Sequence, residues 1–196
     1  MKPSARIFTL QLLMFLPMYS NGYPNGKVEM ACTTMMPQHG AAVQSSIPPY
    51  SLSISSVNHT GILGFRVTLM KNPSQIDFKG FMIQARAPGS AIPQGTFVVN
   101  NTEGLAQTLN CSAFEDTVSH TSPSPKSNVS VIWLPPKRAS TDIRFSATVV
   151  QNRTIFWTQL FSETIRLNSG GPHLLAPTFS QLLLCSTVLI YALRTI

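Results

Sequence analysis

The chain has 196 residues, of which only 11% are charged, and a formal net charge of +7 at pH 7. Apart from Lys137-Arg138 the basic residues are scattered singly, which excludes the clustered basic stripe of a nucleic-acid-binding protein. Three basic residues lie in the two apolar ends, so residues 23–169 carry a net charge of only +4. That central length suits one domain with a real hydrophobic core.

The N-terminus has the layout of a secretory signal peptide over residues 1–22. Lys2 and Arg6 form a short positive region, residues 7–18 form an apolar run, and Ser20-Asn21-Gly22 places small residues before a cleavage point. The run is too short to span a bilayer comfortably. A buried N-terminal helix is the alternative, although no amphipathic face accompanies the run. We therefore expect a mature chain that works in the extracellular space.

The body of the chain alternates apolar and polar residues with a period of two, which is typical of half-buried strands. The apolar positions are Tyr50, Leu52 and Ile54; Phe65, Val67 and Leu69; Phe81, Ile83 and Ala85; Val129, Val131 and Trp133; and Phe145, Ala147 and Val149. A last segment fits two registers, one through Ile155, Trp157 and Gln159 and one through Phe156 and Leu160. Proline-rich breaks separate these runs. The pattern predicts an all-β sandwich of about seven to nine strands, with Trp133 and Trp157 in its core.

Residues 168–196 follow the pattern of a GPI-attachment signal. Small residues at Asn168-Ser169-Gly170-Gly171 precede a spacer of mixed polarity and an apolar run over 182–193. Ser169 and Asn168 are the candidate attachment residues. Two alternatives remain open, a single transmembrane helix over 174–193 and a simple secreted tail. Either a GPI anchor or a transmembrane helix would hold the protein at the cell surface through its C-terminal tail.

The cysteine content predicts one disulfide. Of the three cysteines, Cys185 lies in the C-terminal apolar run, which leaves Cys32 and Cys111 as a pair in an oxidising compartment. A disulfide between them would close a loop of about 80 residues. On chain-entropy reasoning, such a closure stabilises the fold by about 4–4.5 kcal/mol. Free thiols, or bonding to a partner chain, are the alternatives.

Five N-x-S/T sequons lie between the two ends and predict N-glycosylation. Their asparagines are Asn58, Asn100, Asn110, Asn128 and Asn152. Each occupied site must lie on an exposed loop or strand edge. Asn110 is the exceptional site, because the middle residue of its sequon is the predicted disulfide cysteine.

A series of short segments resembles the reeler (reelin N-terminal) domain, a module found at the N-terminus of the ferric-chelate reductase family. The segments are Tyr23-Pro-Asn-Gly-Lys-Val28, Cys32, Met36-Pro-Gln-His-Gly40, Phe78-Lys-Gly-Phe-Met-Ile-Gln-Ala-Arg86, Gly95-Thr-Phe97, Ser119-His-Thr-Ser122, Val131-Ile-Trp-Leu-Pro135 and Phe156-Trp157. The resemblance covers residues 23–167. It implies an immunoglobulin-like antiparallel β-sandwich and the pairing of Cys32 with Cys111.

The resemblance does not imply reductase chemistry in these residues. In the ferric-chelate reductase family that chemistry belongs to a haem-bearing cytochrome b561 module preceded by a DOMON domain, and residues 1–196 carry neither pattern. His39 and His120 fall in family-like segments, but their spacing is not that of metal ligands. No G-x-S-x-G elbow and no glycine-rich phosphate loop occurs. We therefore expect no enzyme activity, no cofactor and no metal site.

The expected function is that of a non-catalytic extracellular recognition module at the cell surface, which binds an unidentified extracellular protein or matrix ligand. Two alternatives remain open. Small stand-alone reeler proteins of insects are immune-induced, so the resemblance also implies a secreted innate-defence protein. A third reading is an accessory chain of a reductase, which would require a haem-bearing partner. Fold alone does not decide among them.

Overall fold

The computed structural model describes residues 23–100, 103–137, 142–168 and 171–174. The predicted signal peptide, the candidate attachment residue Ser169 and the tail over 175–196 lie outside these residues and stay predictions. In the described ranges, no helix is long and apolar enough to cross a bilayer.

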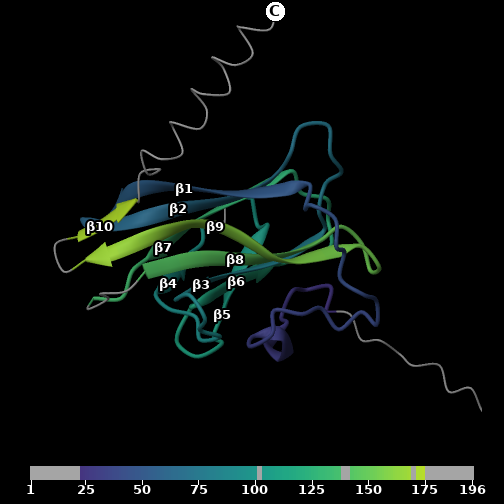
Figure 1. Ribbon diagram of the computed structural model, residues 1–196, viewed down its shortest axis with the longest axis horizontal. Helices are drawn as coiled ribbons and strands as arrows, with labels where there is room; N and C mark the ends of the chain where they lie inside the picture. Colours follow the sequence, from purple (N-terminus) through teal and green to yellow (C-terminus); the bar gives the residue numbers. More distant parts are fainter. Residues whose placement is uncertain (1–22, 101–102, 138–141, 169–170, 175–196) are drawn as a thin grey trace, which may run out of the picture.

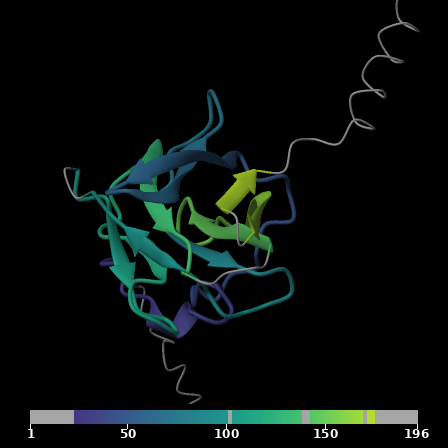
Figure 2. The same ribbon diagram turned by 90° about the vertical axis from the view of Figure 1, so that its left-hand side faces the viewer.

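The described residues form ten strands in two antiparallel sheets that pack face to face (Figure 1). One sheet has the order β1-β2-β7-β4 and the other the order β10-β9-β8-β3-β6-β5. The strands are β1 (Tyr50–His59), β2 (Ile62–Lys71), β3 (Gly80–Arg86), β4 (Thr96–Val98), β5 (Ala106–Leu109), β6 (Thr117–His120), β7 (Asn128–Leu134), β8 (Asp142–Val150), β9 (Phe156–Asn168) and β10 (Gly171–Leu174). The predicted all-β sandwich is confirmed, with one strand more than the upper end of the expected number. The end-on view shows the two layers (Figure 2).

The inward-facing positions of the alternating strands make one core between the sheets. Every apolar residue predicted for β2, β3, β7 and β8 is almost fully buried there. Trp133 is completely buried, and its indole N–H donates to the carbonyl of Gln94 over 2.8 Å. Gly95 follows with φ at +75°, and a Cβ at this residue would come within 2.4 Å of the Trp133 ring. Only glycine fits this position, for both reasons.

A β-bulge in β9 explains why its sequence fits two registers. Compared with its neighbour β8, β9 has one extra residue between Trp157 and Leu160, and Gln159 there adopts a φ of 59°. Trp157 and Leu160 therefore both pack against the core, although they are three residues apart. Phe156 points to the other face and is buried against the ring of His39, 5.8 Å away between ring centroids.

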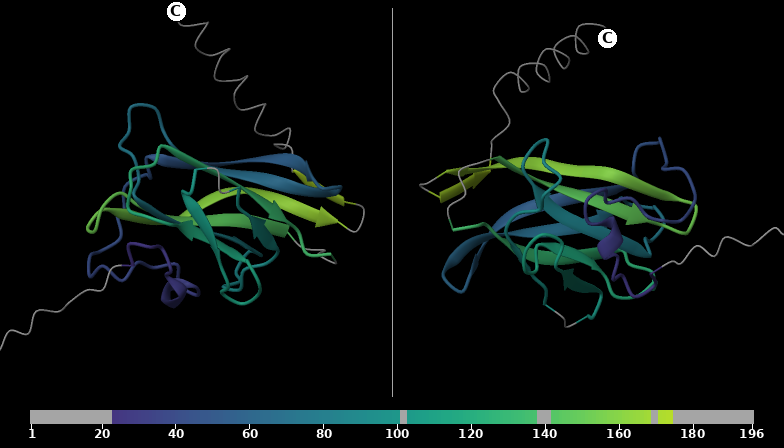
Figure 3. Two further views of the ribbon diagram at one scale, coloured as in Figure 1. Left: turned by 180° about the vertical axis from the view of Figure 1, so that it is seen from behind. Right: turned by 90° about the horizontal axis from the view of Figure 1, so that it is seen from below.

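One end of the outer face of the six-stranded sheet is covered by residues 23–40, which we call the N-terminal cap (Figure 3). The cap contains one short 3₁₀ helix, η1 (Glu29–Ala31), and otherwise crosses the sheet without regular structure (Figure 3). The cap explains why the outward-facing side chains of β3 are buried rather than exposed. Met82 and Gln84 face away from the sandwich core, yet only 3% and 0% of their surface is exposed.

Candidate functional site

The N-terminal cap is fixed to the sandwich by the disulfide expected from the sequence. Cys32 follows η1, and Cys111 lies in the loop between β5 and β6, with the two Cα atoms 5.4 Å apart. The bridge spans 79 residues of sequence. It therefore attaches a segment without regular structure to a loop that is itself held by hydrogen bonds.

A hydrogen-bonded carboxylate holds that loop. Asp116 accepts from the backbone N–H groups of Cys111, Ser112 and Ala113 over 2.9, 2.7 and 2.6 Å. Burial alone would raise the pKa of Asp116, but these hydrogen bonds bring it below its ordinary value. The carboxylate thus serves the fold as an anion and is not placed as a proton donor.

Two polar side chains of β3 hold the cap through hydrogen bonds to its backbone carbonyls. The Gln84 amide donates to the carbonyl of Cys32 over 3.1 Å and to the Thr117 hydroxyl over 3.0 Å. The Arg86 guanidinium donates to the Gln84 side-chain oxygen over 2.7 Å and to the carbonyls of Cys32 and Thr33 over 2.8 and 3.1 Å. These bonds account for the Gln-Ala-Arg part of the segment that carries the family resemblance.

His120 holds the first residue of the cap. Its Nδ1 lies 3.3 Å from the backbone nitrogen of Phe81, and the ring also bonds the backbone of Tyr23. Burial lowers the pKa of His120, and the charge of Lys126 lowers it further. The two backbone hydrogen bonds raise the pKa, but by less. Gly80 leaves space for the ring, since a Cβ there would lie 3.2 Å from it. The histidine is therefore neutral at pH 7 and structural.

His39, the other histidine named from the sequence, lies at the far end of the cap. Burial lowers the pKa of His39, while a backbone contact with Arg153 raises it. Its Nδ1 is buried without a hydrogen-bond partner in the described structure. Among the residues that the structure places, no group of three His, Cys, Asp or Glu side chains could hold a metal ion.

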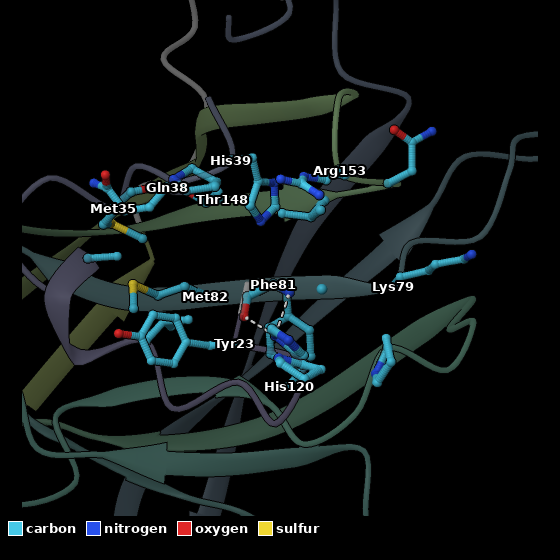
Figure 4. Close-up of a pocket in the computed structure, with 18 of the residues that line it drawn as sticks. Tyr23, Met35, Gln38, His39, Lys79, Phe81, Met82, His120, Thr148 and Arg153 are labelled. Atoms are coloured by element: carbon cyan, nitrogen blue, oxygen red, sulfur yellow. Dashed lines mark hydrogen bonds between the residues drawn. The ribbon is translucent and has the colours of Figure 1, made fainter. Parts of the chain in front are cut away.

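Between the cap and the outer face of β3 and β8 lies a half-open pocket of about 290 Å³ (Figure 4). Side chains of β3, β8, the cap and the turn before β9 line it. Its apolar lining residues are Tyr23, Pro24, Val28, Met30, Ala31, Met35, Pro37, Phe81, Met82, Pro123 and Val150. Its polar lining residues are Gln38, His39, Lys79, His120, Thr148, Asn152 and Arg153, together with the backbone of Gly80.

The two ends of the pocket differ in polarity. In the close-up, Met35, Met82 and Tyr23 lie toward one end, whereas Arg153 and Lys79 lie toward the other (Figure 4). Thr148 is polar, but its hydroxyl already donates to the carbonyl of Met35 over 2.6 Å. None of the lining residues is acidic. The pocket is therefore an apolar space with a cationic end.

Sequence reasoning did not find this pocket. The sequence singles out both histidines, which lie on the lining, but their spacing does not indicate a metal site or any other ligand. The apolar cap residues, such as Val28 and Met35, follow neither a helical nor a strand period. The one available signal was Met82, an apolar residue among the outward positions of a strand that should be polar there.

The predicted glycosylation sites lie on the surface. Asn58, Asn100, Asn110 and Asn128 are exposed, and Asn152 is half-buried at the pocket. The side-chain oxygen of Asn152 accepts from the backbone N–H groups of Thr154 and Ile155, each over 2.9 Å. These positions are compatible with the predicted modification, whose occupancy stays a prediction.

A family model described as the Reeler domain matches residues 30–172, which is most of the chain. The chain belongs to the reeler family. This reeler chain is 37% identical to mouse ferric-chelate reductase 1 over 153 residues, covering 76% of itself but only 25% of the reductase. It is 34% identical to a Drosophila melanogaster protein named as a defense protein, and there the match covers 76% of this chain and 91% of the fly protein.

The human F-spondin reeler domain matches 62% of this reeler chain with a TM-score of 0.49 and 21% sequence identity, covering 91% of the F-spondin fragment. The reeler chain thus spans about a quarter of the mouse reductase and nearly the whole of the fly defense protein.

Proposed function

We propose that this chain is a non-catalytic extracellular recognition module, and that it recognises its ligand through the pocket under the N-terminal cap. The observation that supports the proposal is how the ionisable groups around the cap are used. Arg86 bonds a cap carbonyl, His120 bonds the backbone of Phe81 and of Tyr23 in the cap, and Asp116 holds the loop that carries Cys111. Groups held in this way position a surface, whereas catalysis would need groups aimed at a substrate.

The position of the pocket suits recognition by a tethered protein. β8 runs from Asp142, which pairs with Arg166 near the end of β9, to Val150 on the pocket lining. The eight steps between the first and last of its nine residues span about 26 Å at roughly 3.3 Å each. A C-terminal anchor after residue 168 would therefore leave the pocket at the end of the domain away from the membrane.

The anchor is tested separately from recognition. The complete chain is expressed on animal cells and treated with a phosphatidylinositol-specific phospholipase. If the tail is a GPI signal with Ser169 or Asn168 as the attachment residue, the enzyme releases the protein into the medium. Protein that stays on the cells after treatment contradicts the GPI reading and favours the transmembrane one.

Recognition through the pocket is tested with the released or secreted protein on a panel of cells and matrix preparations. A Val28→Trp substitution adds an indole to the pocket, while Leu63→Trp adds one to an exposed position on β2 as the matched control. We expect the control to bind like the natural chain and Val28→Trp to bind at least tenfold more weakly. Equal binding of both variants would show that the ligand uses another surface.

A second function, secreted innate defence, has a specific observation in its favour. The match to the fly defense protein extends over nearly all of that protein, whereas the reductase match is confined to a quarter of the reductase. The defence reading predicts that the protein is released without phospholipase and binds microbial cells. Surface retention together with no microbial binding would rule it out. An accessory role in a reductase would instead require co-purification with a haem protein.

A further inference from the structure

We infer that the pocket takes a free single-chain amphiphile with one anionic headgroup, such as an alkyl carboxylate of medium length. The inference rests on the proposed function, because it gives the chemical class of the ligand for the same pocket. It follows from the shape, polarity and charge of the lining.

The apolar end of the pocket fits an alkyl chain. Val28, Met35 and Met82 present only hydrocarbon and thioether surface, and methionine side chains adapt readily to a flexible ligand. The half-open pocket of about 290 Å³ has room for several water-sized groups, so it can take an alkyl chain of several carbons.

The charge at the other end selects an anion. Lys79 and Arg153 belong to neither of the two ion pairs found in the described ranges, which join Lys71 to Asp77 and Arg166 to Asp142. Because no acidic side chain lines the pocket, a cationic headgroup would have no counter-charge there. Arg153 lies beside His39, and Lys79 lies farther along the same side, away from Met35 and Met82, so both cations favour a carboxylate at that end of the pocket (Figure 4).

The same lining argues against other ligands. A sugar or peptide inside the pocket would need several free hydrogen-bonding groups, and the Thr148 hydroxyl and His120 Nδ1 are already engaged with backbone atoms. A polyanion would need a longer row of basic residues than the pair Lys79 and Arg153. An alkyl chain with one negative charge instead matches the apolar part of the lining and its two cations.

The test measures binding of octanoate, decanoate and dodecanoate to the purified glycoprotein by calorimetry, below the concentrations at which they form micelles. We expect affinity to rise about fourfold for each added methylene until the pocket is full. Dodecanol and dodecylamine should bind at least tenfold more weakly than dodecanoate. Equal affinity for all three headgroups would overturn the inference.

The variants separate headgroup recognition from chain burial. A Lys79→Gln/Arg153→Gln double variant should lose about tenfold in dodecanoate affinity and keep its affinity for dodecanol, since each partly exposed charge pair contributes modestly. Lys137→Gln, which removes an exposed cation outside the lining, is the control and should bind like the natural chain. An unchanged double variant would overturn the inference.

Two further results decide the source of the ligand and the status of the proposed function. Binding only to anionic vesicles, with none to monomeric carboxylates, would mean that the surface contacts a membrane, and this also overturns the inference. Protein that binds cells through the pocket, as judged by Val28→Trp, but binds no amphiphile would refute the ligand class and leave the recognition function standing.

Discussion

Replacing Gln84 with leucine should remove hydrogen bonds that attach the N-terminal cap to the sheet, while leaving the disulfide intact. The Gln84 side chain is completely buried and makes hydrogen bonds to Cys32, to Thr117 and from the Arg86 guanidinium, with a longer one to Cys111 Sγ at 3.5 Å. A hydrogen bond of this kind contributes about 1 kcal/mol and one to a charged group about 2 kcal/mol. Leucine restores apolar contacts worth about 1 kcal/mol. We therefore expect the free energy of unfolding to fall by about 3 kcal/mol.

The assay is guanidinium denaturation followed by the fluorescence of the buried Trp133 and Trp157. A loss of about 3 kcal/mol corresponds to a fall in Tm of about 10 °C for a domain of this size. Gln75→Leu, an exposed glutamine before β3, is the control and should change stability by less than about 0.5 kcal/mol. If Gln84→Leu costs less than about 1 kcal/mol, the buried amide does not hold the cap and the reasoning is wrong.

Three other perturbations test the fold around the pocket. Replacing both cysteines of the disulfide with alanine should cost about 4.5 kcal/mol in denaturant melts, and a change below about 1 kcal/mol would contradict the loop-entropy estimate. Gly95→Ala should cost about 3 kcal/mol or more, whereas Gly89→Ala, which has a similar φ but open space, should cost only about 1 kcal/mol; equal losses would show that crowding is unimportant. Because the folded pKa of His120 lies below its unfolded value, its contribution to stability is present above about pH 6.5 and lost as the pH falls; His120→Asn should flatten this dependence in melts at pH 7 and 5.

The sandwich was predictable from the sequence because its strands bury one face each. In β2 and β7, for example, the apolar set fills the core and the alternating residues face outward. The short strands β4, β5 and β6 have only three or four residues, too few for an alternation to stand out. β9 was ambiguous because its bulge inverts the register in the middle of the strand.

The pocket was not predictable, because its walls come from segments that no period connects. Residues 23–40 lie on β3 and β8 through a disulfide and through the side chains of Gln84 and Arg86, and neither link leaves a repeating pattern. The family resemblance includes both of these β3 residues in its segment from Phe78 to Arg86. It marked them as important without revealing that they hold the cap.

The covalent link between the cap and the β5–β6 loop also determines how the protein responds to extracellular proteases. The connection over 41–49, between the cap and β1, has no regular structure, so it is a favourable place for a first cut. Such a cut would leave the N-terminal piece joined to the sandwich through Cys32 and Cys111. The bonds from Gln84 and Arg86 would still orient it. A nicked molecule would therefore keep its two pieces together on a non-reducing gel and separate them only after reduction.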